Sequence, residues 1–264
     1  IITSFMSSPI YNSCIQELYL FLVSFCMLYC KKTNRGVNKM NKTYIKLIGG
    51  ALALTMVISF FSAIGIALKM NENGVVLCQI AAFLICGVVS FFYMKKKDPT
   101  LKQFGFKKGK LSRGIIGFMA LIICIQPVVL GINFNLSFST LGLIIIQMLL
   151  VGFVEETFFR GIIFNSLRDK GPKFFIIFSS ILFGLLHMAS SLNPNTAFIL
   201  VILQIINALL LGFVFSFIYY SNQSIYTVIL FHALFNVCAS ISSISSIEKN
   251  IIAVILLSIF YLLF

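Results

Sequence analysis

Charged residues are scarce in this sequence. Only 10% of its 264 residues are charged and 59% are hydrophobic, whereas soluble proteins average about 25% charged residues. This composition excludes an ordinary water-soluble domain. Lipid cannot satisfy open backbone groups, and no segment alternates with the period of a porin strand. The sequence therefore predicts an all-α fold, a polytopic transmembrane helical bundle.

Long apolar stretches predict about eight spans, because a helix needs roughly 20 residues to cross about 30 Å of hydrocarbon. The stretches are residues 18–30, 45–68, 75–94, 114–132, 141–164, 174–188, 196–220, 225–240 and 251–264. We interpret residues 1–39 as an N-terminal extension, either with an extra short span at 18–30 or upstream of a start at Met40. Residues 40–264 are expected to form one helical membrane domain.

Acidic residues are few, and the basic ones are unevenly placed. The net charge is +13, and the basic residues gather at 31–46, 95–113 and 168–173, while the alternate connections carry only Lys69 and Lys249. The positive-inside rule places the three basic connections in the cytoplasm. They lack the aromatic interleaving of single-strand binders, so we expect no nucleic acid. Anionic lipids are the expected neighbours of this multi-pass protein of the cell membrane.

The longest basic connection also contains apolar side chains. Leu101, Phe104, Phe106 and Leu111 lie between its lysines. Such side chains can enter the headgroup region while the lysines remain in water. We therefore expect an interfacial segment at 95–113, unless the whole stretch is simply a solvated run of charge.

Several familiar catalytic motifs are missing. There is no HExxH of zinc proteases and no G-x-S-x-G nucleophile elbow. The only aspartates, Asp98 and Asp169, lie in polar connections, which argues against an aspartyl intramembrane protease. The seven cysteines form no C-x-x-C pair, so neither a disulfide framework nor a cysteine zinc site is expected.

Two adjacent glutamates stand inside an apolar stretch. Glu155 and Glu156 belong to VGFVEETFFRGIIF, where each carboxylate costs roughly 2.5–3.5 kcal/mol at mid-helix. Arg160 follows Glu156 at the helical spacing that favours an ion pair. Such a pair can simply stabilise the helix or mark its cytoplasmic end. Glu155 has no partner of this kind.

Both histidines of the chain also fall in apolar stretches. His187 ends SSILFGLLH, and His232 begins HALFN, which places Asn236 one helical turn later on the same face. A lone histidine in a membrane helix is commonly a hydrogen-bonding residue between helices. Here three stretches each supply polar groups, and a shared pocket would satisfy them all. Gln147, Gln204 and Asn207 either extend that pocket or, more simply, bond helix to helix.

Together these residues match the motifs of a known family. EETFFR fits EExxxR, FGLLH fits FxxxH and HALFN fits HxxxN, in the family's order. The chain resembles the CPBP family of CAAX proteases and bacteriocin-processing or immunity proteins, also called Abi, over about residues 141–240. The resemblance implies a CPBP-type catalytic core in that range.

The resemblance implies a glutamate-dependent intramembrane endopeptidase that needs no cofactor and acts on a membrane-presented peptide or protein. Burial in a low-dielectric pocket raises the proton affinity of a carboxylate, as a general base requires. We expect Glu155 to activate water held by His187, and His232 and Asn236 to stabilise the oxyanion. Glu156 with Arg160 would fix the helix and contact substrate.

Three alternatives stay open on the sequence. Glu155, His187 and His232 could instead hold a catalytic zinc ion, since carboxylate and imidazole are ordinary zinc ligands. The chain could also be a non-catalytic immunity or binding protein. A transporter with a proton relay would use buried glutamate and histidine too.

Overall fold

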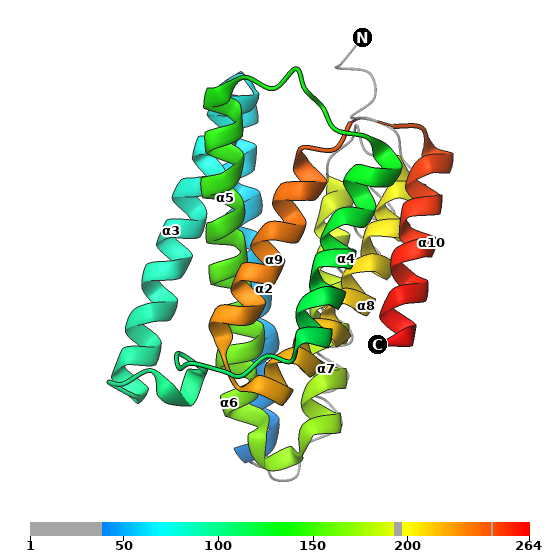
Figure 1. Cartoon of the computed structure of the whole chain (residues 1–264). Helices are drawn as coiled ribbons and strands as arrows, with labels where there is room; N and C mark the ends of the chain where they lie inside the picture. The colour runs from blue at the N-terminus through cyan, green and yellow to red at the C-terminus, as the bar shows by residue number, and fades with distance from the viewer. Residues whose placement is uncertain (1–38, 193–196, 244) are drawn as a thin grey trace.

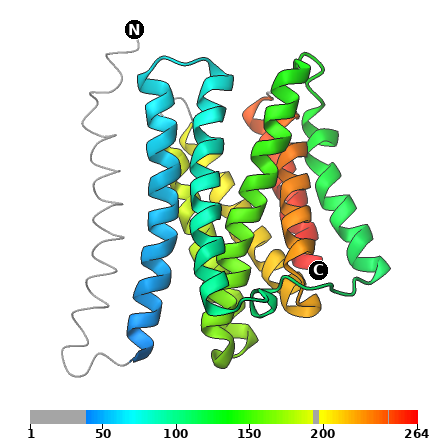
Figure 2. The same ribbon diagram turned by 90° about the vertical axis from the view of Figure 1, so that its left-hand side faces the viewer.

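The computed structural model describes residues 39–192, 197–243 and 245–264. The stretch at 18–30 and the N-terminal extension up to residue 38 lie outside the described residues. The described chain folds into one bundle of helices that run roughly along a common axis (Figures 1 and 2). Within these ranges there are no strands, and the only β-type contact is an isolated bridge between Ile132 and Ser242.

Eight long helices form the described bundle. They are α2 (Lys39–Ala67), α3 (Glu72–Lys97), α4 (Arg113–Leu130), α5 (Phe138–Glu156), α7 (Pro172–Leu186), α8 (Phe198–Asn222), α9 (Ile225–Ser240) and α10 (Ile247–Leu263). Shorter helical segments are η1 (Lys102–Phe104), η2 (Thr157–Ile162), α6 (Ile163–Leu167), η3 (Arg168–Lys170) and η4 (His187–Leu192). Six of the helical stretches are long and apolar enough to cross a membrane. The predicted helical bundle is confirmed, and its eight helices agree with about eight spans.

Polar side chains begin several of these helices. Ser112, Ser137 and Ser246 accept hydrogen bonds from backbone amides of the first turns of α4, α5 and α10, and Asn71 does the same for α3. These bonds satisfy amides that have no partner inside the helix. Each helix therefore starts at a polar residue next to an apolar run.

The outside of the bundle is apolar. Large side chains such as Phe60 (64% exposed), Val89 (64%) and Leu262 (76%) point away from the protein. Contiguous apolar surface of this kind is rare on soluble monomers, and lipid is its natural solvent. The chain is a multi-pass membrane protein.

The basic connections lie at one end of the bundle. In Figure 2 the start of α2, the α3–α4 connection and the α6–α7 turn are all at the lower end. These segments carry Lys46, Lys95–Lys97, Arg113 and Arg168–Lys173. The α2–α3 and α4–α5 connections lie at the opposite end (Figure 2). The helix directions therefore place all the described basic clusters on one side.

This arrangement predicts the orientation in the membrane. Reporter fusions at Lys102 and at Asn135 should give opposite signals, with Lys102 cytoplasmic, because translocating the basic connections opposes their strong preference for the inside. The predicted orientation requires that an alkaline phosphatase fusion be active only at Asn135. It also requires that a green fluorescent protein fusion be fluorescent only at Lys102. The same signal at both positions would contradict the span assignment.

The segment at 95–113 packs on the protein more than the sequence suggests. Phe104 is almost fully buried, and the ring of Phe106 packs at a tilt against Phe153 and edge-to-face against Tyr226. The expectation that Phe104 dips into headgroups is wrong. The amide of Gly105 donates to the Lys102 carbonyl and closes η1, and the carbonyl of Gly105 bonds to the turn between α8 and α9, so the segment lies under that turn. The carbonyl of Gly105 accepts from the Ile225 amide at 2.8 Å.

Asp98 fixes the start of this connection. Its carboxylate accepts hydrogen bonds from the Gln103 amide at 2.9 Å and from the amide and hydroxyl of Thr100 at 3.0 and 2.7 Å. These bonds hold the pKa of Asp98 below its usual value, and the bond from the Gln103 amide has the largest effect. Asp98 therefore has a structural role at the end of α3.

Helices α5 and α9 meet at a glycine. A Cβ atom at Gly152 would lie 2.9 Å from the Ile229 carbonyl oxygen and 3.2 Å from the Ala233 amide nitrogen, both backbone atoms of α9. The glycine lets the two helix backbones approach closely, as small residues do in membrane bundles. This contact lies one helical turn before Glu156 and beside His232.

Replacing this glycine should disturb the helix pair. Gly152→Ala is expected to lower the free energy of unfolding by about 1–3 kcal/mol, because overpacking moves backbone, and to lower activity with it. Gly142→Ala is the matched control, since a Cβ there would have no atom within 4 Å apart from the adjacent backbone of its own helix. Thermal unfolding in detergent compares the two variants. Equal unfolding temperatures would contradict the close contact.

Candidate active site

The two glutamates lie where the helix changes its hydrogen-bond pattern. Helix α5 ends at Glu156, and the following six residues, Thr157–Ile162, form a π-helix. The amide of Ile163 donates to the Phe158 carbonyl, five residues back. Such wide turns are rare and frequent at functional sites. The π-helix places Glu155, Glu156 and Arg160 together at the widened turn.

Glu156 and Arg160 form the buried ion pair that their spacing predicts. Their side chains are fully buried, and Arg160 Nη1 donates to Glu156 Oε1 at 2.9 Å. Arg160 Nη2 donates to the carbonyl oxygen of Gly212 in α8, also at 2.9 Å. The guanidinium therefore ties the π-helix to a neighbouring span as well as to its own carboxylate.

Aromatic rings surround the same guanidinium. The Arg160 Cζ atom lies 4.7 Å from the ring centre of Phe183, 5.3 Å from that of Phe215 and 5.6 Å from that of Phe159. Ring faces attract cations most strongly where water is excluded. These contacts offset part of the cost of burying the charge.

Glu156 also holds one of the histidines. His232 Nδ1 lies 2.8 Å from Glu156 Oε1, and the imidazole is 3% exposed. A carboxylate accepts, so Nδ1 carries the proton. His232 Nε2 then faces the other carboxylate, 3.9 Å from Glu155 Oε2. Phe215 stacks on the imidazole with ring centres 4.9 Å apart. Glu156 and Phe215 fix the ring, and Nε2 is the atom that remains for chemistry.

Glu155 is less enclosed than Glu156. Its side chain is 18% exposed. Its Oε2 atom is nevertheless buried and has no hydrogen-bond partner among the described residues. Water hydrogen bonds are about 2.8 Å long, so one water molecule could touch both Glu155 Oε2 and His232 Nε2.

His187 comes from a third span. It ends α7, and its Nδ1 lies 2.8 Å from the carbonyl oxygen of Phe183, one turn earlier. A carbonyl only accepts, so Nδ1 is the donor of this bond. The Phe183 ring lies between the two histidines, 4.8 Å from His187 and 5.8 Å from His232 by ring centres.

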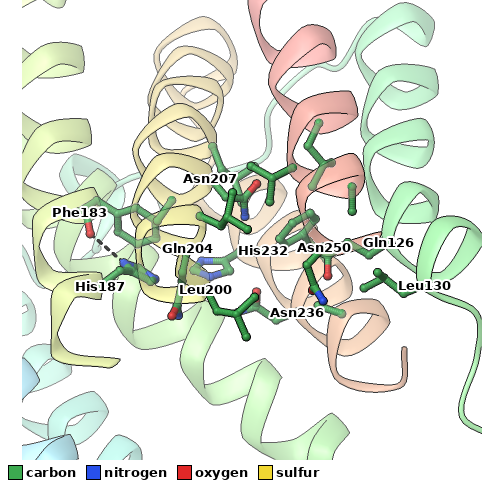
Figure 3. A pocket seen from close by; sticks show the side chains of 18 residues that line it. Gln126, Leu130, Phe183, His187, Leu200, Gln204, Asn207, His232, Asn236 and Asn250 are labelled. Carbon is green, nitrogen blue, oxygen red and sulfur yellow. Dashed lines mark hydrogen bonds between the residues drawn. The ribbon is translucent and has the colours of Figure 1, made fainter. Parts of the chain in front are cut away.

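Two adjoining cavities meet at this cluster. The larger, of about 750 Å³, lies among α2, α3, α5 and α7 and is lined by Glu155. The smaller, of about 320 Å³, is lined by His232 and Asn236 (Figure 3). Phe183, His187 and Gln204 line both. The common pocket expected from the sequence is thus divided, with His187 at the boundary.

The three membrane amides named from the sequence have different roles. Gln147 donates to Gln79 of α3, and Asn207 accepts from the Tyr261 hydroxyl of α10 at 3.2 Å. Both bonds join helix to helix, as the simpler interpretation expected. Asn207 and Gln204 also line the smaller cavity. Gln147 lines neither of the two cavities.

The described residues offer no ready metal site. No group of three or more His, Cys, Asp or Glu side chains in the described ranges is placed to hold a metal ion. Glu155, His187 and His232 are included in that statement. The geometry of these residues therefore does not favour the zinc alternative.

Sequence reasoning missed three features of the site. The π-helix, the bond from His232 to Glu156 and the Gly212 carbonyl that accepts from Arg160 were not expected. All of them depend on how the spans pack. The adjacency of two glutamates was the only local signal that one carboxylate could serve both Arg160 and His232.

One family model matches the part of the chain that contains these residues. It is described as Type II CAAX prenyl endopeptidase Rce1-like and matches residues 137–238. The range includes all three motifs and confirms the resemblance drawn from them. No curated protein and no solved structure matches the chain.

Proposed function

We propose that this protein is an intramembrane endopeptidase in which Glu155 activates the attacking water. One observation carries the proposal: a buried, unpartnered carboxylate oxygen of Glu155 lies 3.9 Å from His232 Nε2 at the edge of a large cavity. A carboxylate placed so can take a proton from water. The match of residues 137–238 to an endopeptidase family supports the same activity.

The proposed hydrolysis of a peptide bond uses one water molecule and residues of this chain. Glu155 takes a proton from water as the oxygen bonds to the scissile carbonyl carbon. The tetrahedral intermediate then collapses, the carbon–nitrogen bond breaks, and the proton on Glu155 passes to the leaving nitrogen. A carboxyl end and an amine end result. His187, which lines both cavities, would hold the water before attack.

Stabilisation of the oxyanion is assigned to α9. His232 and Asn236 line one cavity, one turn apart. The amide of Asn236 can donate, and a protonated His232 can donate through Nε2, because Nδ1 already bonds Glu156. Losing one such donor typically costs about 10²–10³ in rate.

Glu156 and Arg160 are positioning residues, which hold other groups of the site in place. Glu156 fixes the tautomer and orientation of His232, while Arg160 neutralises Glu156 and anchors it to α8. Neither residue needs to touch the reacting atoms. The substrate is a peptide or protein segment presented within the membrane.

Comparative membrane proteomics tests the activity. Cells with the wild-type protein and with Glu155→Ala should differ in one or a few membrane proteins that accumulate uncleaved in the variant. New amino ends of those proteins should be found only in the wild type. Identical proteomes in cells that express both proteins equally would contradict the proposal.

A further inference from the structure

The smaller cavity contains an unusual set of side chains. Carboxamides from four helices line it: Gln126 of α4, Gln204 and Asn207 of α8, Asn236 of α9 and Asn250 of α10. Figure 3 shows them around one space beside His232. We call it the amide-lined cavity. Membrane interiors disfavour such groups unless something satisfies them.

The hydrogen bonds of two amides leave complementary atoms unused. The Asn207 oxygen accepts from Tyr261, so its nitrogen stays available as a donor. The Asn250 nitrogen donates to the carbonyls of Ser245 and Ser246 at 3.3 and 2.9 Å, so its oxygen stays available as an acceptor. The side chains of Gln126 and Asn236, which lie in α4 and α9, make no hydrogen bond to any described residue. The cavity therefore offers both donors and acceptors.

This combination identifies the chemistry of the ligand. Residues that line the cavity include no Lys, Arg, Asp or Glu, so an anionic headgroup would meet no lysine or arginine there and a cation would meet no carboxylate. Polypeptide main chain is uncharged and carries both donors and acceptors. Carboxamides can bond to either kind of group. A main-chain segment thus fits the cavity better than an anionic headgroup or a purely apolar chain does.

We propose that the amide-lined cavity binds the main chain of the substrate next to the scissile bond. This rests on the proposed endopeptidase function and adds the subsite. His232 and Asn236 line the same cavity, so a carbonyl at its inner end would meet the oxyanion donors. Glu155 lines the other cavity across the shared Phe183 and His187. Water would then attack from the opposite side of that carbonyl.

The position of the cavity also orients the substrate. Leu130 at the end of α4, Leu200 near the start of α8 and Asn250 near the start of α10 line it. These helix ends lie opposite the basic connections (Figure 1). The bound segment therefore lies in the half of the bundle away from the basic side.

Main-chain recognition can be tested with backbone-modified peptides. The probe is a degenerate library of acetylated and amidated ten-residue apolar peptides, compared with the same library N-methylated along its backbone. Full-length Glu155→Gln protein in lipid nanodiscs, which should not cleave them, is incubated with both. Retained peptides are counted by mass spectrometry. Retention of the unmethylated library should exceed that of the methylated one by about fivefold for each hydrogen bond lost.

Cavity variants decide whether the preference arises here. In the Glu155→Gln background, Gln126→Leu with Asn207→Leu should bring retention of the two libraries close to parity. Gln126→Leu alone removes no side-chain hydrogen bond of the folded protein. It should reduce the preference for the unmethylated library, but by less than the double variant does. Gln147→Leu, which changes a membrane amide outside the cavity, is the matched control and should keep the full preference. Unfolding temperatures confirm folding.

The outcomes separate the subsite from the activity. A preference that persists in the double variant, or equal retention of both libraries by the parent, overturns the subsite. Wild-type cleavage of the unmethylated library is followed in parallel. Cleavage without a cavity-dependent preference leaves the endopeptidase and removes the subsite. A cavity-dependent preference without cleavage leaves a peptide-binding site and removes the endopeptidase.

Discussion

Glu155→Gln should abolish cleavage of a membrane-presented substrate while the protein stays folded. Glutamine keeps the shape of the side chain but cannot take a proton from water. Loss of a general base typically costs about 10²–10⁴ in rate, so a fall in kcat of at least about 100-fold is expected. Binding of substrate should survive, because the hydrogen-bonding cavity is unchanged. Turnover and peptide retention by purified protein measure the two effects separately.

The control for Glu155→Gln is a variant that loses a carboxylate elsewhere in the chain. Glu72→Gln changes an exposed acid in the first turn of α3 and should leave kcat unchanged. Retained cleavage by purified Glu155→Gln would remove Glu155 from the role of base. Loss of activity in both variants would point to a general effect of net charge.

The same assay separates the alternative functions. A chelator should not affect water activated by glutamate, whereas a zinc enzyme would lose activity and regain it with added metal. A non-catalytic immunity factor would tolerate Glu155→Gln, because gripping a partner needs shape and hydrogen bonds. Chelator-sensitive cleavage with one metal ion bound per chain would favour the zinc alternative.

The fold was largely predictable because its signals are local. Apolar runs of span length and clustered basic residues need no knowledge of packing. The Glu156–Arg160 pair follows from helical spacing in the same way. Serine caps before the runs at 114–132 and 141–164 mark two of the helix starts. These features depend on residues within one or two turns of each other.

The site was predictable only as a set of residues. Motif matches named Glu155, His187, His232 and Asn236, but not that Phe183 and His187 divide their surroundings into two cavities. That division depends on contacts between α5, α7, α8 and α9. The prediction that Phe104 lies in the headgroup region was wrong for the same reason, because its burial comes from packing of the 95–113 segment under distant helices. Lipid and protein are both apolar, so a hydrophobic side chain does not reveal which of them it meets.

Gln126 and Asn250 show another limit. Each stands alone in its stretch of sequence, and neither belongs to a motif. Only the bundle brings them to the cavity that holds His232. A polar residue in a span indicates that it has a partner, but the sequence does not identify the partner.

Arg160→Gln should destabilise the protein by about 3–5 kcal/mol, the usual cost of leaving a buried charge without its partner. Arg160 is fully buried, bonds Glu156 and the Gly212 carbonyl, and lies among three aromatic rings. The variant keeps a hydrogen-bonding group but no cation. The unfolding temperature in detergent and the yield of folded protein should both fall, and activity should fall with them.

A second substitution distinguishes charge from packing. Glu156→Gln added to Arg160→Gln removes the unpaired carboxylate and should restore much of the unfolding temperature, so the two effects should not add. Activity should stay low, because a neutral amide accepts the bond from His232 Nδ1 more weakly than the Glu156 carboxylate and no longer fixes the imidazole as firmly. Equal unfolding temperatures for the single and double variants would mean that the loss came from the aromatic contacts and the Gly212 bond. Recovered activity in the double variant would contradict the role of Glu156 in positioning His232.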